Sequence, residues 1–184
     1  MNRITAYIRQ SLQDIYPPEE VKALSMLICC DMLGVDALDI YMGKDIILSA
    51  CKQRELENII FRLQKNEPIQ YIRGYAEFCG RNFRVAPGVL IPRPETAELV
   101  DLIVKENPDA RRLLDIGTGS GCIAISLDKN LPDAKVDAWD ISEEALAIAR
   151  KNNEELDAQV TFRRQDVFSA DGMQGTSYDI IVSN

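Results

Sequence analysis

Histidine is absent from this sequence of 184 residues, and its five cysteines show no CxxC spacing. The mixed cysteine and histidine sites that hold structural zinc therefore lack their ligands, and we expect no metal centre and idle or buried thiols. No apolar run approaches the roughly 20 residues of a membrane-spanning helix, and the N-terminus lacks an apolar signal segment. We expect a cytoplasmic protein with no membrane partner.

Basic residues are also fewer than acidic ones: the sequence has 21 basic and 29 acidic residues, which gives a net charge of -8. This balance disfavours broad affinity for a phosphate backbone, and nucleic acid is a disfavoured partner. A local basic patch from Arg73, Arg81 and Arg84 stays open. The 46% of hydrophobic residues suffices for one good core or two small ones.

The first 66 residues have helical periodicity and predict a small bundle of four helices. Apolar stripes recur at positions three and four apart: Ile4, Ile8, Leu12 and Ile15, then Val21, Leu24, Leu27 and Ile28, and finally Leu56, Ile59, Ile60 and Leu63. Pro17-Pro18 separates the first two helices, and Gly34 is a helix stop. Asp36 is expected to cap a short helix that runs to Met42.

The pattern changes after residue 66, where 67–95 are rich in glycine, proline and aromatic residues. We expect a β-hairpin turning near residues 80–82 and then an extended segment, together forming a connector between domains. From 96 to 184, strands at 111–117, 134–140, 159–166 and 178–184 are separated by helical patterns at 121–130 and 142–156, after a first helix at 95–107. Such alternation predicts an α/β domain with a parallel, doubly wound sheet.

A glycine loop follows the first of these strands in LLDIGTGSGCIAISL, residues 113–127. Gly117, Thr118, Gly119, Ser120 and Gly121 let the backbone turn tightly and approach a ligand, although a turn without a ligand is an alternative. The spacing is GxGxG, which is neither a dinucleotide fingerprint nor a P-loop. Asp115 suits an ammonium group, such as that of a methionine moiety, better than a pyrophosphate.

Carboxylates also follow the next two strands. Asp140, about 20 residues after the loop, is placed to accept hydrogen bonds from both ribose hydroxyls; helix capping is the alternative, but Ser142 already supplies a cap. Asp166 could accept the adenine amine and Phe168 could cover the ring, unless both belong to an ordinary loop. Together these positions predict S-adenosylmethionine as cofactor and a class I methyltransferase with a Rossmann-like domain.

The last predicted strand, YDIIVSN, carries Asn184 at its tip, where a side chain points into the cofactor crevice. The amide oxygen of Asn184 could bind an N–H of the substrate and align a weakly nucleophilic planar nitrogen with the methyl group. We therefore expect Asn184 to be the catalytic residue, in contact with both substrate and cofactor.

The chain resembles the peptide chain release factor glutamine N5-methyltransferases, the HemK-type family. The resemblance rests on EPIQYIRG at 67–74, GVLIPRPET at 88–96 and the glycine loop, and the helical residues 1–66 fit that family's substrate-recognition domain. It implies methylation of the glutamine in the Gly-Gly-Gln motif of release factors; separately, we expect a monomer. Arg93 and Glu95 would then contact the protein substrate or, as an equal alternative, form an interdomain salt bridge.

Two positions depart from the family pattern. Ala97 stands where a second acidic residue is usual, and the Pro-Pro-Tyr that should follow Asn184 is missing. We therefore expect a chain truncated within the Asn-Pro-Pro-Tyr box and holding only the first half of the methyltransferase domain, so that it methylates poorly. Two other functions stay open: a nucleic-acid adenine or cytosine amino methyltransferase, which shares the box, and a non-catalytic fragment that binds the cofactor or a partner.

Overall fold

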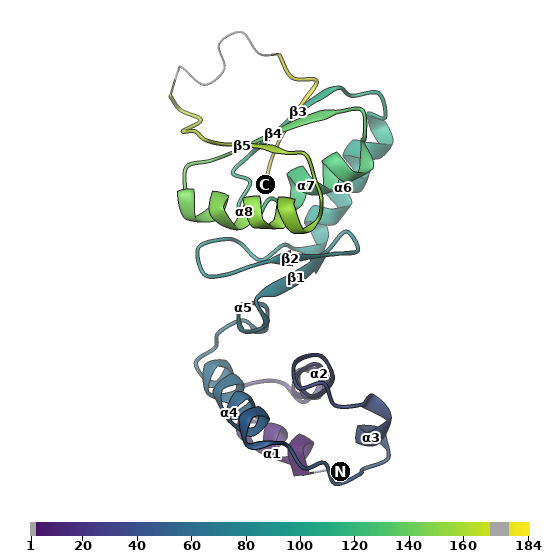
Figure 1. Ribbon diagram of the computed structural model, residues 1–184, viewed down its shortest axis with the longest axis vertical. Coiled ribbons are helices and arrows are strands. Elements are labelled where there is room, and N and C mark those ends of the chain that lie inside the picture. The colour runs from purple at the N-terminus through teal and green to yellow at the C-terminus, as the bar shows by residue number, and fades with distance from the viewer. Residues whose placement is uncertain (1–2, 170–176) are drawn as a thin grey trace. The chain divides into compact units, whose positions relative to one another are not determined.

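The computed structural model describes residues 3–169 and 177–184, and the chain divides into two compact units at Arg73 and Gly74. The first unit is helical and the second is α/β (Figure 1). The predicted boundary lay at 66, but the chain stays with the first unit for seven further residues. A short helix there, α5 (Ile69–Arg73), was not predicted, and its Ile69 and Ile72 pack against the helical core.

The helical unit is built from amphipathic segments around one apolar core. Its other elements are α1 (Arg3–Leu12), α2 (Pro18–Met26), the π-helical segment η1 (Leu27–Met32), α3 (Ala37–Tyr41) and α4 (Ala50–Gln64). Ile8, Leu12, Ile28, Leu56 and Leu63 are almost completely buried, as the periodicity predicted.

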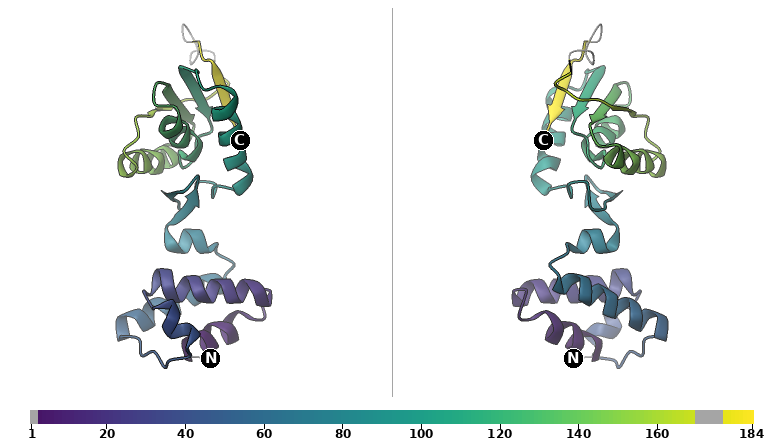
Figure 2. Two further views of the ribbon diagram at one scale, coloured as in Figure 1. Left: turned by 90° about the vertical axis from the view of Figure 1, so that its right-hand side faces the viewer. Right: turned by 90° about the vertical axis from the view of Figure 1, so that its left-hand side faces the viewer.

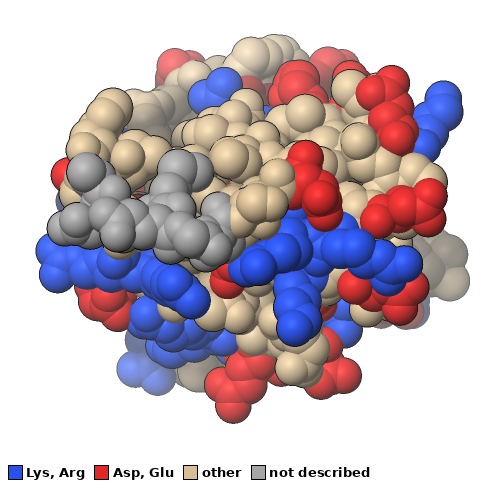
Figure 3. Space-filling view, turned by 90° about the horizontal axis from the view of Figure 1, so that it is seen from above, with Lys and Arg blue, Asp and Glu red and all other residues tan. Residues whose placement is uncertain are grey.

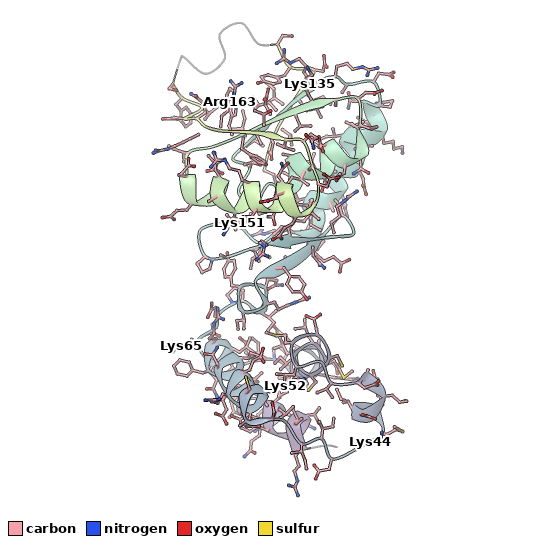
Figure 4. All side chains as sticks on the ribbon, viewed as in Figure 1. Lys44, Lys52, Lys65, Lys135, Lys151 and Arg163 are labelled. Carbon is pink, nitrogen blue, oxygen red and sulfur yellow. The ribbon has the colours of Figure 1, made fainter. Side chains whose placement is uncertain are left out.

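Polar contacts close the ends of these helices. The Asp36 carboxylate accepts a hydrogen bond from the Leu38 N–H and caps α3, as predicted. Lys52, labelled in Figure 4, donates to the carbonyl oxygen of Leu33 after η1 at 2.5 Å. The prediction for Ile15 was wrong: α1 ends at Leu12, and Ile15 is 41% exposed because it lies beyond the helical register.

The second unit begins with an antiparallel hairpin, β1 (Tyr75–Phe78) and β2 (Arg81–Arg84), which turns at Cys79-Gly80. Phe78 and Phe83 meet edge to face with their ring centroids 5.9 Å apart and carry the hairpin into the core of this unit. The hairpin is thus packed against the domain that follows it.

A parallel sheet in the order β5-β4-β3-β6 confirms the predicted parallel sheet of an α/β domain, although the described helices lie on one face of it and not on both, as a doubly wound sheet would require. Its strands are β3 (Arg112–Ile116), β4 (Lys135–Asp140), β5 (Thr161–Arg164) and β6 (Ile180–Ser183); its helices are α6 (Pro94–Glu106), α7 (Cys122–Asn130) and α8 (Glu143–Glu155). Alternate residues of each strand face these helices, and Leu113, Val136, Ala138 and Val182 join one core with them.

The helices and the hairpin cover the same side of the sheet, with α7 and α8 between sheet and hairpin in Figure 1, and Figure 2 shows the strands running alongside one another. Because all four strands are parallel, their carboxyl ends meet at one edge. The residues that end or follow β3, β4, β5 and β6 therefore gather there, and the predicted cofactor residues are among them.

Candidate functional site

The glycine loop between β3 and α7 is held against the neighbouring strand. The N–H groups of Gly117 and Thr118 both donate to the carbonyl oxygen of Trp139, at 2.8 and 3.0 Å. Gly117, Gly119 and Gly121 have φ values of 75°, 55° and 81°, which side-chain-bearing residues adopt rarely. The loop conformation therefore depends on glycine.

Two of these glycines are needed for different reasons. A Cβ on Gly121 would lie 3.1 Å from Ile125 Cδ1 and 3.2 Å from Ala149 Cβ, so this glycine allows α7 and α8 to pack closely. A Cβ on Gly117 would meet nothing within 4 Å. Space above Gly117 is open, as required for a ligand that lies on the loop.

Asp115 is a buried carboxylate beneath the loop, with 1% of its surface exposed. Its Oδ2 accepts a hydrogen bond from the Thr118 hydroxyl at 2.7 Å, whereas Oδ1 has no hydrogen-bond partner among the described residues. Burial raises the pKa of Asp115 to about 6, although the Thr118 hydroxyl and the nearby Ala124 N–H favour the charged form. A cationic donor at Oδ1 would relieve this cost.

Asp140 ends β4 and links the loop to the next helix. Its Oδ2 accepts from the Gly119 N–H and its Oδ1 from the Ser142 N–H, both at 2.9 Å. The cap of α8 is Ser142, whose Oγ accepts from the Ala145 N–H. Each carboxylate oxygen of Asp140 has a second lone-pair site, so both can accept a further bond from a ligand hydroxyl.

Asp166 and Phe168 follow β5 at the same edge, and the Gln165 N–H donates to the carbonyl oxygen of Asp140. The Asp166 carboxylate accepts from the N–H of Phe168 at 2.9 Å and forms a local turn. The Phe168 ring is 94% exposed. The structure thus places Asp166 beside the β4 tip and leaves the Phe168 ring in solvent.

Asn184 follows β6 and lies beside the loop, as its sequence position predicted. Its Nδ2 donates to the Thr96 hydroxyl oxygen at 2.7 Å. Both residues line a small cavity of about 40 Å³ together with Gly117, Thr118 and Arg93. This volume is near that of one water molecule, so the cavity suits a small group, and the rest of a nucleotide would lie across the open edge.

Arg93 and Glu95 start α6 and are both exposed. Arg93 contributes to the cavity lining, whereas Glu95 does not. Within their own unit, neither forms an ion pair with a described residue. Of the three arginines considered for a basic patch, Arg73 pairs with Asp31 in the first unit, and Arg84 pairs with Glu155 in the second.

Sequence reasoning missed two residues of this region, Thr96 and Asn152. Asn152 is 1% exposed on α8; its Nδ2 donates to the carbonyl oxygens of Ser120 and Arg84, and its Oδ1 accepts from the Arg84 N–H. It therefore joins the glycine loop to the hairpin. The available signal was an asparagine seven residues after Ala145, on the apolar stripe of α8.

Two further features that would indicate a function are metal-binding clusters and membrane-spanning helices. In the described part of the chain, no three His, Cys, Asp or Glu side chains lie together as a metal site would require. Within the same residues, the helices all fall short of the length and apolarity needed to cross a bilayer.

Two family descriptions match the sequence, each over one unit. "PrmC N-terminal domain" matches residues 4–74 and "Methyltransferase small domain" matches residues 95–184. Together they reproduce the division between the helical and α/β units.

Three relatives with similar sequences share the same name. "Release factor glutamine methyltransferase" from Flavobacterium psychrophilum is 39% identical over 180 residues, which are 95% of this chain and 63% of the relative. The proteins of that name from Koribacter versatilis and Streptococcus pneumoniae are 50% and 48% identical, over 83% and 70% of this chain and 55% and 46% of their own lengths. The chain thus spans about half to under two thirds of these relatives.

Among solved structures, the 16S rRNA N2 G1207 methyltransferase of Thermus thermophilus, in complex with AdoMet and guanosine, matches with a TM-score of 0.51. The match is 24% identical and covers 60% of this chain and 31% of that one, so it supports the fold alone. The sheet order and the glycine loop agree with this class I methyltransferase fold. The chain belongs to the release factor glutamine methyltransferase family.

Proposed function

We propose that the protein containing this chain transfers a methyl group from S-adenosylmethionine to the side-chain amide nitrogen of a glutamine in a peptide chain release factor, within the Gly-Gly-Gln motif. The observation that carries the proposal is the position of Asn184: its amide lies beside the glycine loop, in a cavity sized for a small group. The shared name of relatives 39% to 50% identical supports the substrate class.

The residues of the sheet edge fit the proposed cofactor. Asp115 offers an unsatisfied buried carboxylate oxygen for an ammonium group, and the open space over Gly117 leaves room for a ligand on the loop. Asp140 has free lone-pair capacity for ribose hydroxyls, and Asp166, which follows the adjacent strand β5, would accept the adenine amine. Phe168 would have to turn from solvent to cover the ring. When bound, the cofactor supplies an activated sulfonium methyl group.

The chain's own contribution to the reaction is placement. A glutamine amide nitrogen is a weak nucleophile because its lone pair is delocalised into the carbonyl group. The Oδ1 of Asn184 would accept a hydrogen bond from that nitrogen and hold it in line for attack, which lowers the entropic cost of the reaction. No histidine is required, because the side chain orients the nitrogen and need not abstract its proton in advance.

We also propose how the protein substrate is bound, the oligomeric state and the cellular location. The helical unit would receive the release factor, with Arg93 and Glu95 contributing at the start of α6, and the protein would act as a cytoplasmic monomer. Figure 3 shows groups of Lys and Arg bordered by Asp and Glu, and Figure 4 places Lys135 and Arg163 on the sheet but Lys151 on α8. Such mixed charge suits a protein substrate better than a nucleic-acid backbone.

The test uses the full-length protein that contains this sequence, with radiolabelled S-adenosylmethionine and three acceptors in parallel: a release factor, total RNA and DNA. We expect label in the release factor alone and, by mass spectrometry, one added methyl on the Gly-Gly-Gln glutamine. A release factor with that glutamine replaced by alanine is the matched control. Label in RNA or DNA instead would establish a nucleic-acid methyltransferase, and cofactor binding without label in any acceptor would indicate a binding protein.

A further inference from the structure

Thr96 lies within reach of the proposed catalytic amide although 88 residues separate the two in sequence. It occupies the first turn of α6, two residues after Pro94, and is 6% exposed. Its backbone N–H donates to the carbonyl oxygen of Arg93, so the turn itself is already closed without the side chain. The hydroxyl oxygen accepts a hydrogen bond from an N–H of the Asn184 side chain.

A side-chain amide has two chemically different ends, and nothing in its shape distinguishes them. The oxygen accepts hydrogen bonds while the nitrogen only donates, so an Asn184 turned by 180° would present N–H groups to the substrate's own N–H groups. The Thr96 oxygen engages Nδ2 at 2.7 Å. A hydroxyl can also donate, but here its oxygen accepts from Nδ2, and because the amide is planar this arrangement leaves Oδ1 as the end available to a substrate.

We propose that Thr96 is a positioning residue, which holds the Asn184 amide with its oxygen toward the substrate nitrogen. The inference deepens the proposed function and rests on it. Thr96 and Asn184 line the same cavity as Gly117, so the oriented amide lies where the cofactor and the substrate would meet.

If the Thr96 hydroxyl had a purely structural role, its removal would lower the stability of the protein; a positioning role predicts no such loss. Loss of this one hydrogen bond costs little stability where water can take its place. Thr96→Val retains the size of the side chain and removes only the hydroxyl. We therefore expect an unchanged melting temperature and an unchanged affinity for S-adenosylmethionine by calorimetry.

Activity should respond instead. In the full-length enzyme, we expect Thr96→Val to lower kcat for release factor methylation by about tenfold, the effect of losing one orienting hydrogen bond, with little change in KM. Thr96→Ser keeps the hydroxyl and should restore most of the activity. In an Asn184→Ala background, Thr96→Val should cause no further loss, because the group that it orients is gone.

A spectroscopic readout separates this inference from the proposed function. In ¹⁵N-labelled chain, the side-chain amide signals of Asn184 should be shifted from free asparagine values in the wild type and in Thr96→Ser, and should move toward them in Thr96→Val. Unchanged signals, or full activity of Thr96→Val, would overturn the positioning role. A wild-type enzyme that labels no release factor would instead refute the proposed function, while the amide signals would still test the bond.

Discussion

Replacement of Asp115 by asparagine should stabilise the α/β unit while weakening its cofactor site. The carboxylate is 1% exposed, and its pKa is raised by burial from 3.8 to about 6. Between these two values the unfolded chain has lost the proton that the folded chain retains. Stability therefore falls as the pH rises through this window, and the cost is complete above pH 6.

The magnitude follows from the size of the shift. A rise of about two pKa units corresponds to roughly 3 kcal/mol at about 1.4 kcal/mol per unit. The amide introduced by Asp115→Asn would keep an acceptor for the Thr118 hydroxyl but carry no charge, so the variant should escape this cost. We expect the difference in unfolding free energy, Asp115→Asn minus wild type, to grow by roughly 3 kcal/mol from about pH 3 to about pH 7.

Urea unfolding followed by tryptophan fluorescence measures this difference for the α/β unit. Trp139 is the sole tryptophan of the sequence, is 3% exposed, and lies in β4 next to the residue paired with Asp115. A stability difference that does not grow over this pH range would refute the reasoning. Calorimetry at neutral pH should show weaker binding of S-adenosylmethionine to the variant, because the carboxylate that we propose for its ammonium group is lost.

Asp179→Asn is the matched control, since its shift has the opposite sign. The backbone N–H groups of Arg111 and Arg112 donate to the Asp179 carboxylate and lower its pKa. Its stabilising contribution is therefore present at neutral pH and is lost as the pH falls through the depressed pKa. The wild type should exceed Asp179→Asn in stability at neutral pH, and the two should converge in acid.

The remaining predictions concern the glycine loop and its support, and the same fluorescence assay tests them. Gly121→Ala should lower the unfolding free energy by about 2–4 kcal/mol, through its positive φ and the crowding of α7 against α8, and an unchanged stability would contradict that packing argument. Gly117→Ala should cost only about 1–2 kcal/mol, because its Cβ enters open space, but should weaken cofactor binding in calorimetry. Asn152→Leu removes three hydrogen bonds and should cost about 3 kcal/mol or more, with Asn152→Gln as the amide-retaining control. A leucine variant as stable as the wild type would mean that water replaces those bonds.

Local pattern was sufficient for most of the fold. Apolar spacing predicted α1, α2 and α4, since each must bury one stripe, and alternation of strands with helices predicted the parallel sheet. Two short segments differ from the prediction. Ile15 follows the stripe but lies past the end of α1, and α5 is five residues long, too short to show a period. The exposure of Ile15 and the helical conformation of α5 depend on packing against residues that are distant in sequence.

The sequence by itself determined which residues come to the edge of the sheet, because strand direction and glycine spacing place Gly117, Asp140 and Asn184 at the carboxyl ends of their strands. Only the tertiary structure decided what these residues contact. The bond from Asn184 to Thr96, the link from Asn152 to the loop, and the burial of Asp115 join positions far apart in the chain or depend on the packing around them. Hydrogen bonds and desolvation act over a few ångströms in space, whereas sequence periodicity reports only which face of its own element a residue occupies.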